Sequence, residues 1–234
     1  GTVYNEFYDL LKAGSHYAKA LQMDFGSKHL WQRFIHHVCY GYLRGVEKIE
    51  DSNSLLRQLI EKWNKDDLEE IVTFFWIRRK DAPASDAPKV LALWEMIGSH
   101  YETKKELSID DKILLAHLAK LSAYLDSIDA RKLQLLQLSA KYADAGHDTP
   151  MFVENLDRLA NDSPREAAQV YLEMLTNDIF PNFEVEHIVS CVEKVYKSGE
   201  RDLGNRICNM YLQRGYEFLR EIFDRYNRDD NPSE

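Results

Sequence analysis

Apolar residues recur at intervals of three and four along most of this 234-residue chain. This spacing places them on one face of an α-helix, where they can be buried together. The sequence has no sustained alternation with a period of two and no Asn-Gly or Asp-Gly hairpin turn, so strands are not expected. The clearest stripes are Leu114, Leu118, Leu121 and Leu125; Leu133, Leu136, Ala140 and Ala143; Val185, Ile188, Val189, Val192, Val195 and Tyr196; and Phe218, Leu219, Ile222, Phe223 and Tyr226. The sequence therefore predicts an all-α protein.

Capping residues and prolines mark where these helices begin. Proline at the first helical position costs no hydrogen bond, and Thr149-Pro150 and Ser163-Pro164 fit that position. Glu166 follows Ser163 at the spacing of a capping box, so we expect the Ser163 hydroxyl to accept the backbone N–H of Glu166. Ser108 begins another helix, with two aspartates in its first turn. The predicted helices span residues 3–22, 27–48, 54–63, 66–79, 88–103, 109–126, 130–144, 150–161, 164–177, 184–198, 200–214 and 216–226.

The spacing of the later helices predicts a repeat. From residue 88 onward, alternate predicted helices begin about 32–42 residues apart, the length of a two-helix unit in armadillo, HEAT and tetratricopeptide proteins. A single helix hairpin cannot bury its apolar face alone, whereas stacked hairpins share a continuous core. We therefore expect stacked antiparallel helix hairpins in an irregular α-solenoid of the HEAT, armadillo or TPR type. An irregular helical bundle remains the alternative.

Aromatic content separates the first third of the chain from the rest. Residues 1–80 hold 13 of the 27 aromatic residues. A polar segment with two prolines, 81–88, follows and is a linker or long loop. We expect an aromatic-rich helical subdomain at 1–80, degenerate helical repeats at 89–226 and a polar tail without regular structure at 227–234. Whether residues 1–80 form a separate domain stays open.

The charge of the chain disfavours two classes of partner. The net charge is −9, and residues 81–234 carry 18 Lys and Arg against 28 Asp and Glu. Such a surface repels the phosphates of nucleic acids and anionic membranes. No apolar run approaches the length of about 20 residues that spans a bilayer. We therefore expect a protein partner rather than a nucleic acid or a membrane.

Cysteine usage and the N-terminus predict where the protein resides. Cys39, Cys191 and Cys208 are odd in number, scattered and flanked by apolar residues, which is typical of reduced, buried thiols. We expect a cytoplasmic location. The sequence shows no signal peptide and begins Gly1-Thr2 without an initiator Met, so we expect a piece of a longer protein.

Motifs for cofactors and catalysis are missing from the sequence. It has no phosphate-binding G-x-x-x-x-G-K-[ST] or G-x-G-x-x-G loop and no G-x-S-x-G or H-E-x-x-H sequence. The densest metal-ligand cluster, around His36 and Cys39, offers fewer than the four ligands of a zinc site. The acidic run 66–70 lies in the first turn of a predicted helix, where the helix dipole stabilises solvated carboxylates. We expect no cofactor, no metal and no enzymatic activity in this chain.

Two groups of residues are candidates for binding. Trp76-Ile77-Arg78-Arg79-Lys80 is the compact basic cluster of the chain, and Trp76, Arg78, Arg79 and Lys80 are our candidate partner-binding residues. A basic helix C-terminus explains the same cluster without a partner. The second group, Trp31, His36, His37 and Tyr40, combines aromatic and titratable residues and would suit a pocket for a small molecule or for catalysis.

The last third of the chain resembles a known class of repeats. The segments that carry the resemblance are Ser163–Ala168, Tyr171–Leu175, Phe180-Pro181, Ile207–Tyr211 and Gly215–Arg220. They are similar to the C-terminal helical repeats of large multidomain bacterial proteins, among them nucleotide-binding oligomerisation ATPases of anti-phage defence systems. The resemblance implies a role in sensing a trigger protein. It brings no catalytic residue, because the ATPase and effector motifs of those proteins lie outside the repeats.

These observations favour a non-catalytic protein-interaction module, a sensor or scaffold from a larger bacterial protein. The alternative is a helical small-molecule-binding or catalytic protein with its site in the aromatic N-terminal part. A deep pocket lined by Trp31, His36, His37 and Tyr40 would favour the alternative.

Overall fold

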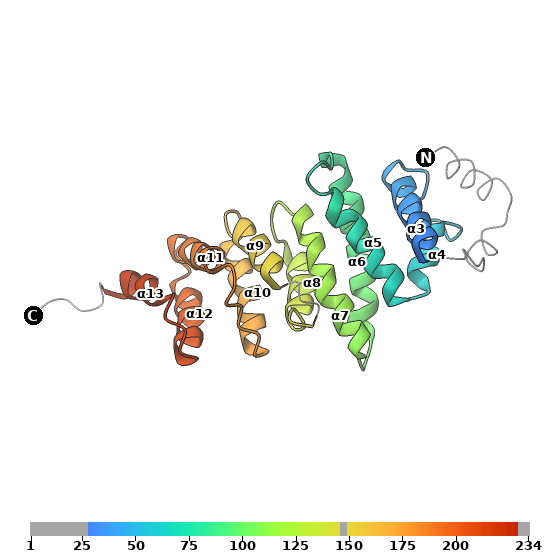
Figure 1. The fold of residues 1–234 in the computed structure, drawn as a ribbon. Coiled ribbons are helices and arrows are strands. Elements are labelled where there is room, and N and C mark those ends of the chain that lie inside the picture. The colour runs from blue at the N-terminus through green and yellow to red at the C-terminus, as the bar shows by residue number, and fades with distance from the viewer. Residues whose placement is uncertain (1–27, 146–148, 229–234) are drawn as a thin grey trace, which may run out of the picture. The chain divides into compact units, whose positions relative to one another are not determined.

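The computed structural model describes residues 28–145 and 149–228, and all regular structure in these ranges is helical (Figure 1). The predicted all-α class is confirmed. The chain divides into two compact units, residues 1–99 and residues 100–234. The predicted helix at 3–22 and residues 229–234 of the predicted tail lie outside the described residues. None of the described helices is both long and apolar enough to cross a bilayer.

Unit 1 contains four described α-helices, the last of which continues into unit 2. They are α3 (Lys28–Leu43), α4 (Leu55–Glu61), α5 (Lys65–Arg78) and α6 (Ala87–Thr103), with the short 3-10 helix η1 (Ala84–Asp86) before α6. Helices α3, α4 and α5 pack against one another. Their three-and-four spaced apolar residues, among them Phe34, Val38, Leu59, Ile71 and Phe75, are buried in this core.

The connection between α3 and α4 is held by its own polar groups. Gly45 takes a left-handed conformation, φ 76°, and ends α3 with backbone hydrogen bonds from Gly45 to Tyr42 and from Val46 to Gly41. This turn explains why α3 ends at Leu43 and not at 48 as predicted. The buried carboxylate of Glu47 then accepts hydrogen bonds from the Ser54 hydroxyl and the Leu55 N–H at the start of α4.

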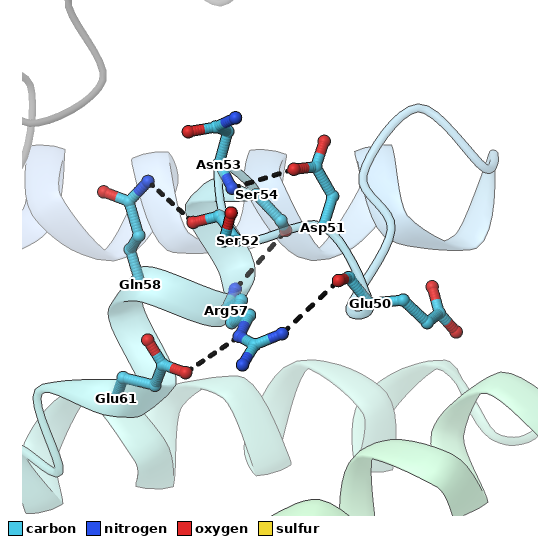
Figure 2. A network of polar contacts seen from close by, with 8 residues as sticks. All are labelled: Glu50, Asp51, Ser52, Asn53, Ser54, Arg57, Gln58 and Glu61. Carbon is cyan, nitrogen blue, oxygen red and sulfur yellow. Dashed lines mark hydrogen bonds and ion pairs between the residues drawn. The ribbon is translucent and has the colours of Figure 1, made fainter.

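Arg57 ties the first turn of α4 to the preceding loop (Figure 2). Its guanidinium bonds the Glu61 carboxylate at 2.8 Å and the Glu50 carbonyl at 3.3 Å, and its backbone N–H bonds the Ser54 hydroxyl. Ser54 is the N-cap residue of α4. These bonds fix where α4 begins.

The described part of unit 2 contains seven further α-helices and one longer 3-10 helix. They are α7 (Ile109–Leu118), η2 (Ala119–Tyr124), α8 (Ala130–Ala140), α9 (Thr149–Leu159), α10 (Pro164–Thr176), α11 (Val185–Lys197), α12 (Arg201–Gln213) and α13 (Arg220–Asn227). Helix α7 begins after Ser108 as predicted, and Ser108 forms a capping box in which the Asp111 carboxylate accepts the Ser108 N–H.

Helices two apart in the sequence pack together in unit 2. The pairs are α8 with α10, α10 with α12, and α9 with α11, in addition to sequence neighbours. Helices α10 and α12 run parallel, because an ion pair joins Arg165 and Glu200 at their starts and another joins Asp178 and Arg214 after their ends. Helices α8 and α10 also run parallel, because Ile128 before α8 bonds Ser163 before α10, and Lys141 after α8 pairs with Glu173 late in α10. Helices α10 and α12 begin 37 residues apart, at Pro164 and Arg201.

Similar backbone turns end three helices of unit 2. After α11 and α12, Gly199 and Gly215 take φ values of 88° and 84°, and Asp178 takes 65° after α10. In each case two backbone N–H groups bond back to carbonyls of the last turn, which is a Schellman motif. The turn at Gly215 places Tyr216 against Tyr211, with ring centroids 5.6 Å apart. Residues 216–219 therefore do not continue a helix, and α13 begins at Arg220 instead of the predicted 216.

Two further predictions about local structure were wrong. Ser163 makes no side-chain cap bond to α10; its hydroxyl accepts the buried N–H of Ile128 at 2.8 Å instead. The predicted helix 109–126 changes to the 3-10 helix η2 after Leu118. There the guanidinium of Arg158, from α9, bonds the carbonyls of Ser122 and Leu125. In both places a contact from another segment binds a polar group that the local sequence pattern had placed in a bond within the helix. The groups are the Ser163 hydroxyl and the backbone carbonyls of Ser122 and Leu125.

Candidate functional site

Helices α3 and α5 lie side by side and run parallel, because residues early in one contact residues early in the other. Trp31 Nε1 donates to Asp67 at 2.6 Å, and Gln32 Nε2 donates to Glu70 at 2.8 Å. Farther along, His36 Nε2 lies 2.5 Å from Glu70. The two predicted groups of candidate residues stand on these neighbouring helices, so the structure brings them onto one pair.

The acidic first turn of α5 is used for packing. Asp67 is only 8% exposed. Burial raises the pKa of Asp67, and the hydrogen bond from Trp31 offsets only part of this effect. Glu70 accepts bonds from both Gln32 and His36. The expectation that these carboxylates are solvated is therefore wrong for Asp67 and Glu70, because both face α3.

Tyr40, at the C-terminal end of α3, lies between two arginines. The Arg44 guanidinium carbon is 4.3 Å from the Tyr40 ring centroid, and that of Arg78 is 5.2 Å away. Arg44 also donates a hydrogen bond to the Tyr40 hydroxyl at 3.0 Å. Tyr40 comes from the group predicted to line a pocket, whereas Arg78 comes from the group predicted to bind a partner. The structure brings these two residues into contact.

The end of α5 adds a second aromatic residue with a cation on it. The guanidinium of Arg79 lies 3.2 Å from the Trp76 ring centroid, and its Nη1 donates to the Trp76 carbonyl. Lys80 follows and is exposed. We call these residues together the cationic patch: Tyr40, Arg44 and Arg78 where α3 meets α5, and Trp76, Arg79 and Lys80 at the end of α5.

The cations of the patch are not neutralised within the described part of the chain. Among residues 28–145 and 149–228, Arg44, Arg78, Arg79 and Lys80 form no ion pair with a carboxylate. Two large apolar side chains, Val46 and Ile77, are exposed beside the same helix ends, Ile77 at 63%. A surface of unpaired guanidinium groups, aromatic rings and exposed apolar side chains has the composition of a protein-binding hot spot.

Arg78 differs from the other cations of the patch. Its guanidinium lies over Phe74 as well as Tyr40, and its Nε is buried without a hydrogen-bond partner in the described structure. Arg78 therefore packs between α3 and α5, whereas Lys80 faces solvent. The exposed members are the ones suited to contact a partner.

The residues predicted to line a small-molecule pocket lie along α3. Trp31 and His36 bond α5, and His36 also lies against the Phe74 ring, 5.3 Å between centroids. His37 is half-buried. A hollow of about 500 Å³ lies in unit 2 and is lined by none of these residues.

The buried thiols do not provide a nucleophile. Burial raises the pKa of Cys39 and of Cys208, to about 11 for Cys208, so neither forms a thiolate near neutral pH. In the described ranges, no three His, Cys, Asp or Glu side chains are grouped to hold a metal ion.

Sequence reasoning missed Arg44 and the contact of Tyr40 with Arg78. The signal was present, since Tyr40 and Arg44 are four residues apart on one helix face. The pairing of α3 with α5 cannot be read from that spacing. No known protein family, curated protein or solved structure matches this chain.

Proposed function

We propose that this chain is a non-catalytic protein-interaction module, a sensor or scaffold that belongs to a larger bacterial protein. The observation that carries the proposal is the cationic patch, where Arg44 and Arg78 lie against Tyr40 and Arg79 lies against Trp76. These three arginines form no ion pair with a carboxylate in the described residues, and neither does the exposed Lys80. Arginine and aromatic side chains supply much of the binding energy at protein interfaces.

The patch predicts the chemistry of its partner. Unpaired guanidinium groups bind carboxylates through two parallel hydrogen bonds, and the exposed Ile77 side chain favours an apolar contact beside them. A protein segment that alternates acidic and apolar residues meets both requirements. A duplex nucleic acid is the less suitable occupant, because the rest of the chain is acidic.

The arrangement of helices in unit 2 supports the same proposal. Parallel packing of helices two apart, about 37 residues from start to start, is the geometry of stacked helix hairpins. Such stacks present extended surfaces to proteins. The similarity of residues 163–226 to the repeats of bacterial anti-phage ATPases supports a sensing role in a parent protein of that class.

Affinity capture from the native host tests the proposal. The bait is the whole chain, and its test variant is Arg79→Glu/Lys80→Glu. Arg78 stays unchanged because it packs between α3 and α5. The matched control, Lys105→Glu/Arg206→Glu, changes the charge equally at exposed positions of unit 2. We expect a protein retained by the wild type and the control and lost from the test variant. Equal retention by all three would contradict the patch.

A further inference from the structure

A hollow in unit 2 combines aromatic rings, one of them exposed, with acidic groups. Its volume is about 500 Å³. Its lining includes Asp144, Asp178, Phe180, Phe183, Arg214 and Tyr216. A neighbouring hollow of about 430 Å³ shares Asp178, Phe180 and Arg214 with it, so the two form one groove. We call this surface the loop groove.

The loop groove lies where three parallel helices end. Asp144 follows α8, the segment from Asp178 to Phe183 follows α10, and Arg214 and Tyr216 follow α12. Because α8, α10 and α12 pack together as a row, their C-terminal ends gather along one edge. The C-terminal end of a helix carries partial negative charge, so this edge favours a cation.

The surrounding sequence is negatively charged, like the helix C-termini at this edge. Residues 141–190 carry ten Asp and Glu against three Lys and Arg. The carboxylate of Asp144 is exposed and forms no ion pair with a described residue. A positively charged ligand is therefore attracted to the groove from a distance and finds a carboxylate within it.

Phe183 marks the groove as a binding surface. Its side chain is 71% exposed, and Val185 beside it is also exposed. An exposed phenylalanine at the rim of a hollow is the type of residue that a bound partner covers.

Arg214 shows how the groove receives a guanidinium group. Its guanidinium lies 4.7 Å from the Phe180 ring centroid and pairs with the Asp178 carboxylate. Phe180 is in turn supported by the Tyr216 ring, 6.4 Å away and nearly parallel. The groove already binds one arginine of its own chain, and Phe183 with Asp144 offers a second ring and a second carboxylate.

We propose that the loop groove binds a basic segment of a partner protein and receives one of its arginine side chains. The guanidinium stacks on Phe183 and pairs with Asp144, as Arg214 does with Phe180 and Asp178. This inference rests on the proposed function, because it assumes that the chain binds proteins, but it concerns a different surface and a partner of opposite charge.

The test uses two labelled twelve-residue peptides made of Gly-Ser-Arg units. In the second peptide citrulline, which is neutral and of the same shape, replaces every arginine. Binding to the whole chain is measured by fluorescence anisotropy at physiological salt. We expect the arginine peptide to bind more tightly. Equal binding of both peptides would overturn the proposal.

Variants then separate the groove from general attraction to an acidic protein. Phe183→Ala and Asp144→Asn should each weaken arginine-peptide binding by about 2-fold to 5-fold, the range of a single exposed cation–π contact or ion pair. The matched controls, Ile109→Ala and Asp126→Asn, alter an exposed apolar residue and an exposed acid elsewhere in unit 2 and should bind as the wild type does. Equal weakening by the controls would overturn the site.

Arg214→Ala gives the sharpest result. Removing this guanidinium frees Phe180 and Asp178 and removes a positive charge, so the arginine peptide should bind several-fold more tightly. A purely structural role for Arg214 would leave binding unchanged or weaken it, and either result would contradict the proposal. Arg79→Glu/Lys80→Glu lies in unit 1 and should leave peptide binding unaltered. Failure of the groove can thus be distinguished from failure of the cationic patch.

Discussion

The Ser163 hydroxyl accepts a hydrogen bond at 2.8 Å from the backbone N–H of Ile128, 35 residues earlier in the chain. Both residues are buried. The bond therefore joins the loop before α8 to the loop before α10, two helices that pack together. Other polar contacts across unit 2 span a similar separation, such as the 40 residues between the hydroxyls of Tyr171 and Tyr211.

Replacing Ser163 tests this contact. Ser163→Ala leaves the buried N–H of Ile128 without its acceptor and should lower the free energy of unfolding by about 1–3 kcal/mol. Urea denaturation measures the change. Ser163→Thr keeps the hydroxyl and should recover part of the loss. A wild-type midpoint for Ser163→Ala would show that the bond does not form.

The turn after α10 can be improved. Asp178 has φ 65° at the position where α11 and α12 have Gly199 and Gly215. Asp178→Gly should raise the free energy of unfolding by about 0.5–1 kcal/mol, because glycine adopts this conformation without strain. Loss of the exposed ion pair between Asp178 and Arg214 offsets a small part of this gain. The converse change, Gly199→Asp, should destabilise by a similar amount. Thermal denaturation of both variants measures the two changes. If the midpoints of Asp178→Gly and Gly199→Asp shift in the same direction, the account is contradicted.

Gly204 is required by a close approach between α11 and α12. A Cβ atom at this position would lie 2.8 Å from ring atoms of Tyr196. That ring is held by stacking on Tyr226, with 4.6 Å between centroids, and by a hydrogen bond to Asn205. Gly204→Ala should therefore cost about 1–2 kcal/mol despite the better helix propensity of alanine. In a Tyr196→Leu background the same change should become neutral or stabilising in chemical denaturation.

The contact of His187 with Asp157 predicts a pH dependence of stability. The Asp157 hydrogen bond, at 2.8 Å, raises the pKa of His187 above its usual value, although burial opposes this. Burial alone would raise the pKa of Asp157, but hydrogen bonds from Lys194, His187 and Ser190 bring it below its usual value. Glu154 and Glu184 also favour the charged imidazole.

The sign of the effect follows from the raised pKa. The contribution of His187 is complete below its unfolded pKa of about 6.5 and is lost as the pH rises through the folded pKa. Because the imidazole is partly exposed, His187→Gln should cost only about 0.5–1 kcal/mol at pH 5.5 and less at pH 8.5. Denaturation at both pH values checks this. In an Asp157→Asn background the difference between the two pH values should shrink.

The sequence predicted the positions of the helices better than it predicted where they end and which segments contact them. The stripe from Val185 to Tyr196 coincides with α11, because a buried apolar face determines where a helix packs. The Ser163 cap was predicted from a correct local pattern, yet its hydroxyl bonds Ile128 instead. The helix predicted over 27–48 ends at Leu43 because Gly45 takes a left-handed conformation, a signal that was present in the sequence and not used.

The candidate sites were predictable in part. Trp76, Arg78, Arg79 and Lys80 form a compact basic cluster in the sequence, whereas Tyr40 meets Arg78 only because α3 packs parallel to α5. The loop groove could not be predicted, since Asp144, Phe183 and Arg214 come from the segments that follow α8, α10 and α12. The roles of both surfaces in binding stay predictions.

Titration of a purified partner, identified by affinity capture, tests the central claim most directly. Isothermal calorimetry measures the dissociation constant for the wild-type chain, for Arg79→Glu/Lys80→Glu and for the control Lys105→Glu/Arg206→Glu, at low and at physiological salt. We predict a dissociation constant at least about tenfold weaker for the patch variant, the effect of losing one hot-spot contact, with the control close to the wild type. The advantage of the wild type should decrease as salt increases. Equal affinity of the patch variant and the wild type at both salt concentrations would contradict the claim that this chain binds its partner through the cationic patch.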